Sequence, residues 1–224
     1  MSPEASRPPR PVNSVTVHAD GRARCAWCGL SDLERDYHDA HWGTPLRDDR
    51  ALFEMLCLEG AQAGLSWLTI LKKRENYRLA FDGFDPEKMA GYGPDKIDAL
   101  LRDTGIVRNR LKINAFIANA RAFLALAETS AGLSDFVWGF VSGTVVRNTW
   151  KTLGEIPAKT RESEAMSREL VKRGFKFVGP TICYAFMQAV GLVDDHVLAC
   201  WRRNGTAAPG TAPGGGTTSL GRRP

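Results

Sequence analysis

Leu56–Trp67, with the sequence LCLEGAQAGLSW, is the stretch that decides the fold, and it belongs to a largely apolar run from Ala51 to Leu71. The length and apolar content of this run predict a central helix that extends to Lys73 or beyond. The run holds one carboxylate, Glu59, and an unpaired carboxylate is costly to bury. Glu59 is therefore expected either to have an internal partner, such as an arginine, or to face a cavity where a ligand supplies one.

Two glycines, Gly60 and Gly64, follow Glu59 in the same run. Each costs about 1 kcal/mol of helix propensity relative to alanine. Their presence predicts that another part of the molecule approaches this backbone closely, and that the helix can break near them. A glutamate beside glycines and Trp67 has the features of a pocket wall, whereas glycines used only for helix packing are the alternative.

The chain of 224 residues is 43% hydrophobic, which suffices for one domain or two small lobes. No apolar run approaches the roughly twenty residues that a membrane helix needs, and the first residues lack the apolar segment of a secretory signal. Five cysteines, an odd number, favour metal binding or buried thiols over disulfides. These features predict a cytoplasmic protein that does not enter membranes.

The two ends of the chain differ from its body in composition. Residues 1–23 and 202–224 are rich in Pro, Gly, Ser, Thr and Arg without apolar periodicity, so both are predicted to be disordered tails. The body, residues 24–201, is electrically neutral, and the net charge of +5 therefore lies in the tails. Within the body, residues 145–180 are basic, which is a modest indication of phosphate contact.

Helical periodicity, helix-start signals and the absence of strand alternation predict an all-α chain. Asp48 and Asp49 mark the start of the central helix. Residues 24–45 show little periodicity and are expected to be ordered but irregular. The other predicted helices are 86–91, 94–102, 111–127, 134–141, 162–172, one from Pro180 and one from near Asp194.

One set of side chains has the composition of a zinc site. His196 and Cys200 are four residues apart on the last predicted helix and would share one face. Cys25 and His38 offer a second pair of ligands, which completes a Cys₂His₂ set for a structural Zn²⁺. Cys28 could serve as the zinc ligand in place of Cys25. The alternative to a zinc site is a group of buried thiols with a surface histidine.

The segment from Arg173 to Thr181 is a turn rich in Gly and Lys between two predicted helices, and it resembles a helix-hairpin-helix. Backbone N–H groups at the start of the second helix would bind a DNA phosphate. The candidate DNA contacts are Lys176, Gly179 and Thr181. Taken alone this pattern is weak, because any glycine-containing turn between helices has a similar sequence.

Four aromatic residues flank Glu59 in the sequence: Trp27, Tyr37, Trp42 and Trp67. Aromatic side chains are more often plain core. Rings beside a buried glutamate are also what a pocket for a flipped base requires.

Several of these motifs occur together and in one order that resembles the type I 3-methyladenine DNA glycosylases. The resemblance spans residues 24–201 and rests on the following segments: Tyr37–Asp39 with Trp42-Gly43, Leu58–Trp67, Leu71–Arg78, Arg173–Gly179, and Asp195–Val197 with Cys200.

The resemblance implies a two-lobed helix-hairpin-helix glycosylase fold in which zinc tethers the N-terminal and C-terminal regions. It selects Cys25 over Cys28 as the ligand that joins His38, His196 and Cys200. It also implies roles at the site: Glu59 as the catalytic residue that binds the base, Tyr37 and Trp67 stacking on the base, Trp27 lining the pocket, and Gly64 with Leu65 filling the gap in the duplex.

The implied reaction is hydrolysis of the N-glycosidic bond of 3-methyladenine in double-stranded alkylated DNA by a monomer, which leaves an abasic site without strand cleavage. Asp194 departs from the family pattern, where an uncharged residue is expected, and is interpreted as a helix N-cap or as a group that stabilises the sugar cation. The competing function is a zinc-stabilised protein that binds damaged DNA without catalysis.

Overall fold

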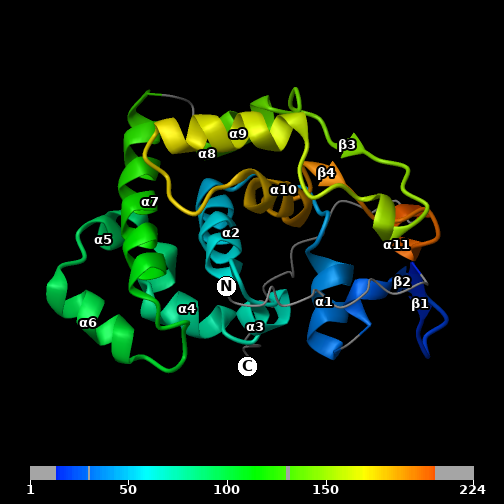
Figure 1. Ribbon diagram of the computed structural model, residues 1–224, viewed down its shortest axis with the longest axis horizontal. Helices are drawn as coiled ribbons and strands as arrows, with labels where there is room; N and C mark the ends of the chain where they lie inside the picture. The colour runs from blue at the N-terminus through cyan, green and yellow to red at the C-terminus, as the bar shows by residue number, and fades with distance from the viewer. Residues whose placement is uncertain (1–13, 30, 130–131, 205–224) are drawn as a thin grey trace, which may run out of the picture.

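The computed structural model describes residues 14–29, 31–129 and 132–204, and most of these residues are helical. Helix α2 (Asp49–Gln62) runs through the middle of the molecule (Figure 1). On one side lie α4 (Arg74–Ala80), α5 (Pro86–Ala90), α6 (Pro94–Arg102) and α7 (Arg110–Thr129). The predicted all-α fold is therefore confirmed as mostly helical, although the described residues also form two small two-stranded sheets.

The other side of α2 combines early and late parts of the chain. It contains α1 (Asp32–Ala40), α3 (Trp67–Leu71), α8 (Leu133–Gly139), α9 (Arg161–Lys172), α10 (Pro180–Ala189) and α11 (Trp201–Asn204), with short 3-10 turns at Ala26–Cys28 and Leu153–Glu155. A third 3-10 turn, Asp82–Phe84, lies between α4 and α5. In Figure 1 the blue N-terminal segments and the orange α11 lie side by side. The segments that carry the predicted zinc ligands, near the start and the end of the folded body, thus lie next to each other.

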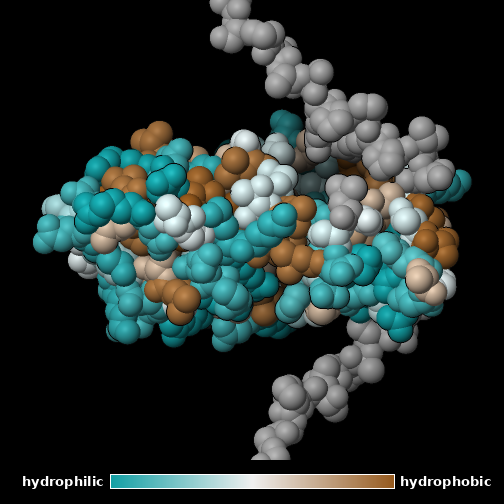
Figure 2. Space-filling model, turned by 90° about the horizontal axis from the view of Figure 1, so that it is seen from below, coloured by the Kyte–Doolittle hydropathy of each residue, from teal (hydrophilic) through white to brown (hydrophobic). Residues whose placement is uncertain are grey.

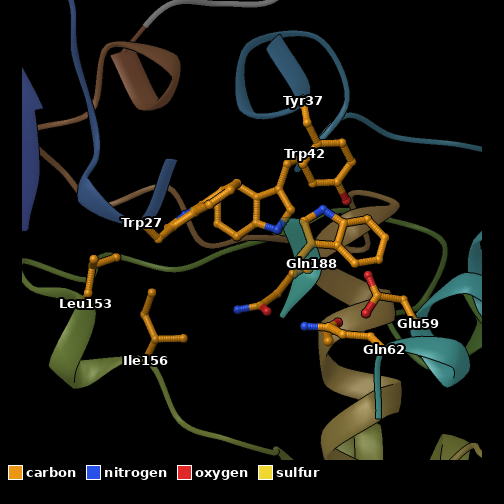
Figure 3. Close-up of a pocket in the computed structure, with 10 residues that line it drawn as sticks. Trp27, Tyr37, Trp42, Glu59, Gln62, Leu153, Ile156 and Gln188 are labelled. Atoms are coloured by element: carbon orange, nitrogen blue, oxygen red, sulfur yellow. The ribbon is translucent and has the colours of Figure 1, made fainter. Parts of the chain in front are cut away.

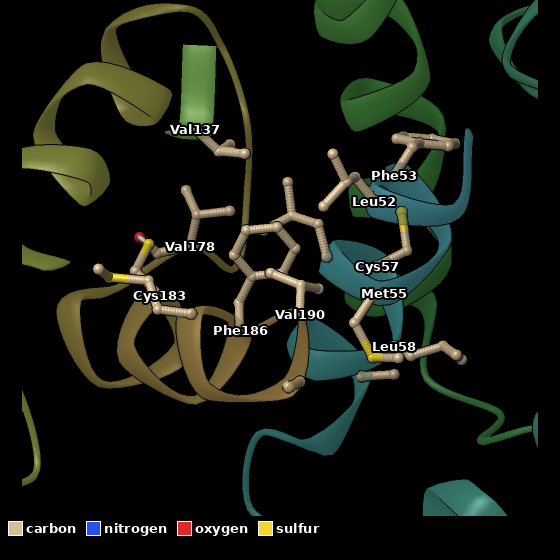
Figure 4. Packing of buried hydrophobic residues seen from close by; sticks show 14 of the residues in the cluster. Leu52, Phe53, Met55, Cys57, Leu58, Val137, Val178, Cys183, Phe186 and Val190 are labelled. Atoms are coloured by element: carbon tan, nitrogen blue, oxygen red, sulfur yellow. Dashed lines mark hydrogen bonds between the residues drawn. The ribbon is translucent and has the colours of Figure 1, made fainter. Parts of the chain in front are cut away.

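Helix α2 forms because its start is capped and most of its length is apolar. The Asp48 carboxylate accepts a hydrogen bond from the Ala51 N–H at 2.8 Å, as the acidic pair predicted. The helix is buried from Leu52 to Ala61 and packs against α8 and α10. Figure 4 shows side chains of α2 meeting those of α10 in the core. A helix enclosed in this way gives every polar side chain it carries a fixed position.

The break that the glycines predicted lies after Gln62. Gly64 has a φ of +77°, and no atom outside its neighbours would lie within 4 Å of a Cβ there, so its role is the left-handed backbone and not a close approach. Gly60 does permit a close approach, since a Cβ would lie 3.2 Å from the Phe177 carbonyl oxygen. The buried Lys112 ammonium donates to the carbonyls of Ala61 and Ala63 at 2.7 Å and so caps the end of α2.

The predicted N-terminal boundary and the irregular segment both need correction. Strand β1 (Val15–Val17) pairs antiparallel with β2 (Ala23–Cys25), so residues 14–23 belong to the folded body. Residues 32–40 form α1, capped by Ser31, whose hydroxyl accepts from the Glu34 N–H. This helix was missed because it is short and mainly polar, with only Leu33, Tyr37 and Ala40 as apolar positions at helical spacing. The predicted C-terminal boundary is also wrong, because residues 202–204 form part of α11, which begins at Trp201. The rest of the predicted tails, residues 1–13 and 205–224, lies outside the described residues.

The helix predicted from near Asp194 is wrong. Strand β4 (Val193–Asp194) pairs in parallel with β3 (Val146–Arg147), and the chain then turns until α11 begins at Trp201. The Asp194 carboxylate accepts a hydrogen bond from the His196 N–H at 3.3 Å, and the Leu198 N–H donates to the Trp150 carbonyl. In a helix the Leu198 N–H would donate to the Asp194 carbonyl oxygen, but that oxygen accepts from the Asn148 N–H instead, so both groups are paired with another segment of the chain.

No helix within the described ranges is long and apolar enough to cross a bilayer. The face seen in Figure 2 is mainly hydrophilic where residues are described, with hydrophobic residues in small separate groups.

Candidate base pocket and metal centre

A cavity of about 360 Å³ opens beside the C-terminal half of α2 (Figure 3). Its walls come from helices α1, α2, α3 and α10, the loop that follows α1, the 3-10 turn Ala26–Cys28, and the 3-10 turn Leu153–Glu155 with the residue that follows it. The lining residues are Trp27, Tyr37, Trp42, Glu59, Gln62, Trp67, Leu153, Ile156, Ala185 and Gln188. The structure thus brings together the predicted site residues Glu59, Tyr37, Trp67 and Trp27, which lie far apart along the chain.

Glu59 is 4% exposed, and its Oε2 atom has no hydrogen-bond partner within the described part of the chain. Of the two sequence-based alternatives, the structure therefore favours the cavity. Burial raises the pKa of this carboxyl from 4.5 to about 8. The other buried glutamate of α2, Glu54, lies against Arg74 and Arg78 instead.

The raised pKa predicts how stability depends on pH. The folded protein keeps the Glu59 proton up to pH about 8, whereas the unfolded chain loses it near 4.5. Stability from this group is therefore fully present below pH 4.5 and is lost as pH rises through 8. Glu59→Gln cannot ionise, so relative to the wild type it should gain on the order of 4 kcal/mol between pH 5 and pH 8.5. Urea unfolding of the two proteins, prepared in the same way, measures this difference, and a constant difference across that range contradicts the assignment.

Aromatic side chains surround the Glu59 carboxylate. The rings of Tyr37 and Trp67 are 5.2 Å apart, and those of Trp27 and Trp42 are 5.1 Å apart. The Tyr37 hydroxyl and the Trp67 Nε1 are buried without a hydrogen-bond partner in the described residues. Burial, and next the nearby Glu59, raise the pKa of Tyr37, so its hydroxyl stays protonated. The cavity thus combines flat apolar walls with unpaired donors and an unpaired acceptor, which suits a planar ligand bearing both kinds of group.

Sequence reasoning missed half of the cavity wall. Gln62, Leu153, Ile156, Ala185 and Gln188 line it. Gln62 lies within the stretch Leu56–Trp67 but was not predicted as a site residue, and the other four lie outside every segment on which the resemblance rests. Trp42 was considered only as one of four aromatic residues. Gln188 could have been suspected as a polar residue among the apolar positions of the helix from Pro180, but nothing local shows that it faces Glu59.

The four predicted metal ligands also lie together. Cys25, His38, His196 and Cys200 are buried, and their ligand atoms lie within 4.8 Å of one another. The Cys200 sulfur is 3.4 Å from His38 Nε2 and 3.6 Å from His196 Nδ1. Cys28 is buried but does not belong to this group. The cluster forms although His196 and Cys200 lie on a turn, because the turn brings the two side chains to the same side.

Neighbouring groups orient both histidines toward the cluster. His38 Nδ1 is 2.8 Å from Asp39, which also accepts hydrogen bonds from Arg24. His196 Nε2 is 3.3 Å from the Trp42 carbonyl oxygen. Each ring can donate its other N–H to these acceptors, which leaves His38 Nε2 and His196 Nδ1 as free lone pairs. Two thiols and two such nitrogens fit tetrahedral Zn²⁺.

The cluster is built into the wall of the cavity. Tyr37 precedes His38 in α1, and Trp27 lies between Cys25 and Cys28 with its ring 5.5 Å from that of His38. Trp42 is both a lining residue and the acceptor for His196. A metal that holds the four ligands would therefore also hold three of the aromatic walls.

A second hollow adjoins the first. It is lined by Gly64, Leu65 and Thr181, with Glu59, Gln62, Ile156, Ala185 and Gln188 shared between the two. Leu65 is 40% exposed at the rim. Thr181 lies in the first turn of α10, whose N–H groups have no partner inside the helix. Gly179 is the N-cap residue of α10, and the exposed Lys176 donates its backbone N–H to Asn119 at 2.7 Å.

Comparison with known proteins identifies close relatives. A family model described as methyladenine glycosylase matches residues 27–203. The chain is 53% identical over 177 residues to DNA-3-methyladenine glycosylase 1 of Escherichia coli (strain K12), which covers 79% of this chain and 95% of that protein. A crystal structure of 3-methyladenine DNA glycosylase I matches with a TM-score of 0.78 at 52% identity, over 80% of this chain and 98% of that one. The Staphylococcus aureus enzyme, studied for its recognition of 3-methyladenine, matches with a TM-score of 0.78 at 37% identity, over 80% and 96% of the two chains.

Proposed function

This chain belongs to the methyladenine glycosylase family, and we propose that it releases 3-methyladenine from alkylated double-stranded DNA in base excision repair. The observation that carries the proposal is Glu59, a buried carboxylate without a partner inside a cavity walled by aromatic rings. The enzyme hydrolyses the N-glycosidic bond and leaves an abasic site. It acts in the cytoplasm as a monomer.

The positive charge of the substrate explains why a cavity that does not protonate the leaving base suffices for base release. 3-Methyladenine in DNA is cationic, so its glycosidic bond is weak and the base leaves without being protonated. The rings of Tyr37 and Trp67 stack on the extruded base, with Trp27 at the far wall. Glu59 ionises against the cation and accepts a hydrogen bond from it, whereas neutral adenine offers no charge to offset the burial of the carboxylate.

The DNA lies across the second hollow. The exposed turn at Gly64 and Leu65 is proposed to enter the gap left by the extruded nucleotide. The segment Arg173–Thr181, between α9 and α10, is proposed to act as the hairpin of a helix-hairpin-helix. Thr181 and the N-terminal turn of α10 bind a phosphate there, next to the N-cap Gly179, and the Lys176 ammonium, which is exposed, adds charge. This assignment rests on Gly64, Leu65 and Thr181, which line the second hollow together.

Zn²⁺ is the metal proposed for Cys25, His38, His196 and Cys200, since the donor set and the oriented histidines fit it. When bound, it supplies a cross-link between the start and the end of the folded body. All four positions are filled by protein, so the residues of the cluster act by holding Tyr37, Trp27 and Trp42 in place.

A base-release assay tests the proposed function. Duplex DNA treated with a methylating agent is incubated with the protein, and free bases are separated by chromatography. We expect 3-methyladenine in the soluble fraction, abasic sites in the DNA and no strand breaks until alkali is added. Unmethylated duplex is the control. Tight binding to damaged duplex without release of base would contradict the proposal and favour a non-catalytic binding protein.

A further inference from the structure

A buried carboxylate outside the base pocket is connected to it by a single side chain. Asp195 is fully buried and accepts four hydrogen bonds, each 2.7 Å long, from Asn148, Trp150, Tyr184 and Gln188. Of these donors only Gln188 lines the base pocket. Asp194, the residue that the sequence singled out, lines neither hollow and contacts the His196 N–H and Arg203. The carboxylate that communicates with the site is thus the next one along the chain.

The hydrogen bond to Asp195 fixes which atom Gln188 presents. A carboxylate accepts hydrogen bonds, so the amide must turn its Nε2 toward Asp195 Oδ2. Its Oε1 is then left for the pocket, and no described residue donates to it. Figure 3 shows the Gln188 amide at the pocket, with that of Gln62 nearby. An amide free to rotate would present either atom, whereas this one presents an acceptor.

The position of Gln188 indicates what that acceptor meets. If the base occupies the first hollow and the DNA backbone follows the second, the glycosidic bond crosses the boundary that the two hollows share. Three of the shared lining residues bring polar side chains there: Glu59, Gln62 and Gln188. Glu59 is engaged with the base, and Gln188 is the one whose orientation is fixed by a buried charge.

We propose that Gln188 Oε1 holds the water molecule that attacks the sugar, and that Asp195 is the positioning residue that keeps this oxygen directed at it. The inference rests on the proposed function. The water donates one O–H to Oε1, and its lone pair forms the bond to C1′ while the C1′–N9 pair leaves with the base. The cationic base departs neutral, and the proton released from the water passes to solvent. The buried negative charge of Asp195 also favours the positive charge that develops on the sugar.

Gln188→Met tests the proposal, because it keeps the length of the side chain and removes the acceptor. The single-turnover rate of 3-methyladenine release should fall about 100-fold. Binding of free 3-methyladenine, followed through tryptophan fluorescence, and binding of an abasic duplex should change less than about 2-fold, because the base and backbone contacts remain. Asp195→Asn should lower the rate with little change in the half-saturating DNA concentration.

Asn148→Ala is the matched control, since it removes a different donor to Asp195 and does not line the pocket. It should keep the rate within about 3-fold of wild type even if it lowers the melting temperature. An unchanged rate in Gln188→Met overturns the proposal, and so does a loss of affinity for the free base as large as the loss of rate, which would make Gln188 a base-binding residue. Wild-type activity measured in parallel separates either outcome from a failure of the proposed function.

Discussion

Glu59→Gln should lower the single-turnover rate of 3-methyladenine release by about 10- to 100-fold, and Glu59→Ala by at least as much. The glutamine keeps the volume and an acceptor oxygen but cannot carry the negative charge that meets the cationic base. A hydrogen bond to a charged group contributes about 1.5–3 kcal/mol, and each 1.4 kcal/mol corresponds to about tenfold in rate. Chromatographic measurement of free base from methylated duplex, with enzyme in excess, gives the rate directly.

Glu54→Gln is the matched control for this experiment. Glu54 lies one and a half turns earlier on the same buried helix, but it pairs with Arg74 and Arg78 and does not line the pocket. Its substitution should reduce stability and leave base release nearly unchanged. The opposite profile is expected at Glu59, where the glutamine raises stability at high pH while abolishing most of the activity. Full activity in both Glu59 variants would remove the residue from the mechanism.

These opposite profiles show how much of the site the sequence reveals. Glu59 could be found because a lone carboxylate in an apolar helical run is physically anomalous, and the anomaly has a local cause that can be read from the residues. Gly60 was found for the same reason, and the approach of Phe177 to within 3.2 Å of a Cβ at this position confirms it. Gly64 was also singled out, but glycine is needed there for its positive φ and not for a close approach of another segment.

The rest of the site depends on contacts between distant segments, which local patterns do not encode. Ala185 and Gln188 become lining residues only when α10 packs beside α2. Asp195 accepts hydrogen bonds from segments near residues 148 and 184. The sequence therefore does not show which of the adjacent residues Asp194 and Asp195 is connected to the site. The turn from Asp194 to Cys200 was mistaken for a helix because an interval of four residues suits both a helical face and a closed turn.

Metal binding by the cluster carries the largest expected effect on stability. The purified protein should contain about one equivalent of Zn²⁺, and Cys25→Ser should lose most of it. Binding of a structural zinc contributes about 10–16 kcal/mol in small zinc-dependent domains, so even partial loss should lower the melting temperature markedly. Base release should fall as well, because Tyr37 adjoins His38 and Trp27 packs on it. Metal analysis and thermal unfolding, with and without a chelator, measure both effects.

Cys28→Ser is the sharpest control, because Cys28 is a buried cysteine three residues away that lies outside the cluster. Like Cys25→Ser, it replaces one sulfur atom with oxygen, but the variant should keep the metal and most of the activity. Retention of zinc in Cys25→Ser together with its loss in Cys28→Ser would reassign the ligand. Absence of metal from the wild type, with a melting temperature insensitive to chelator, would show that hydrogen bonds among thiols and imidazoles alone hold the chain ends together. The aromatic walls would then owe their position to packing, and Tyr37 should remain in place when any one of the four residues is replaced.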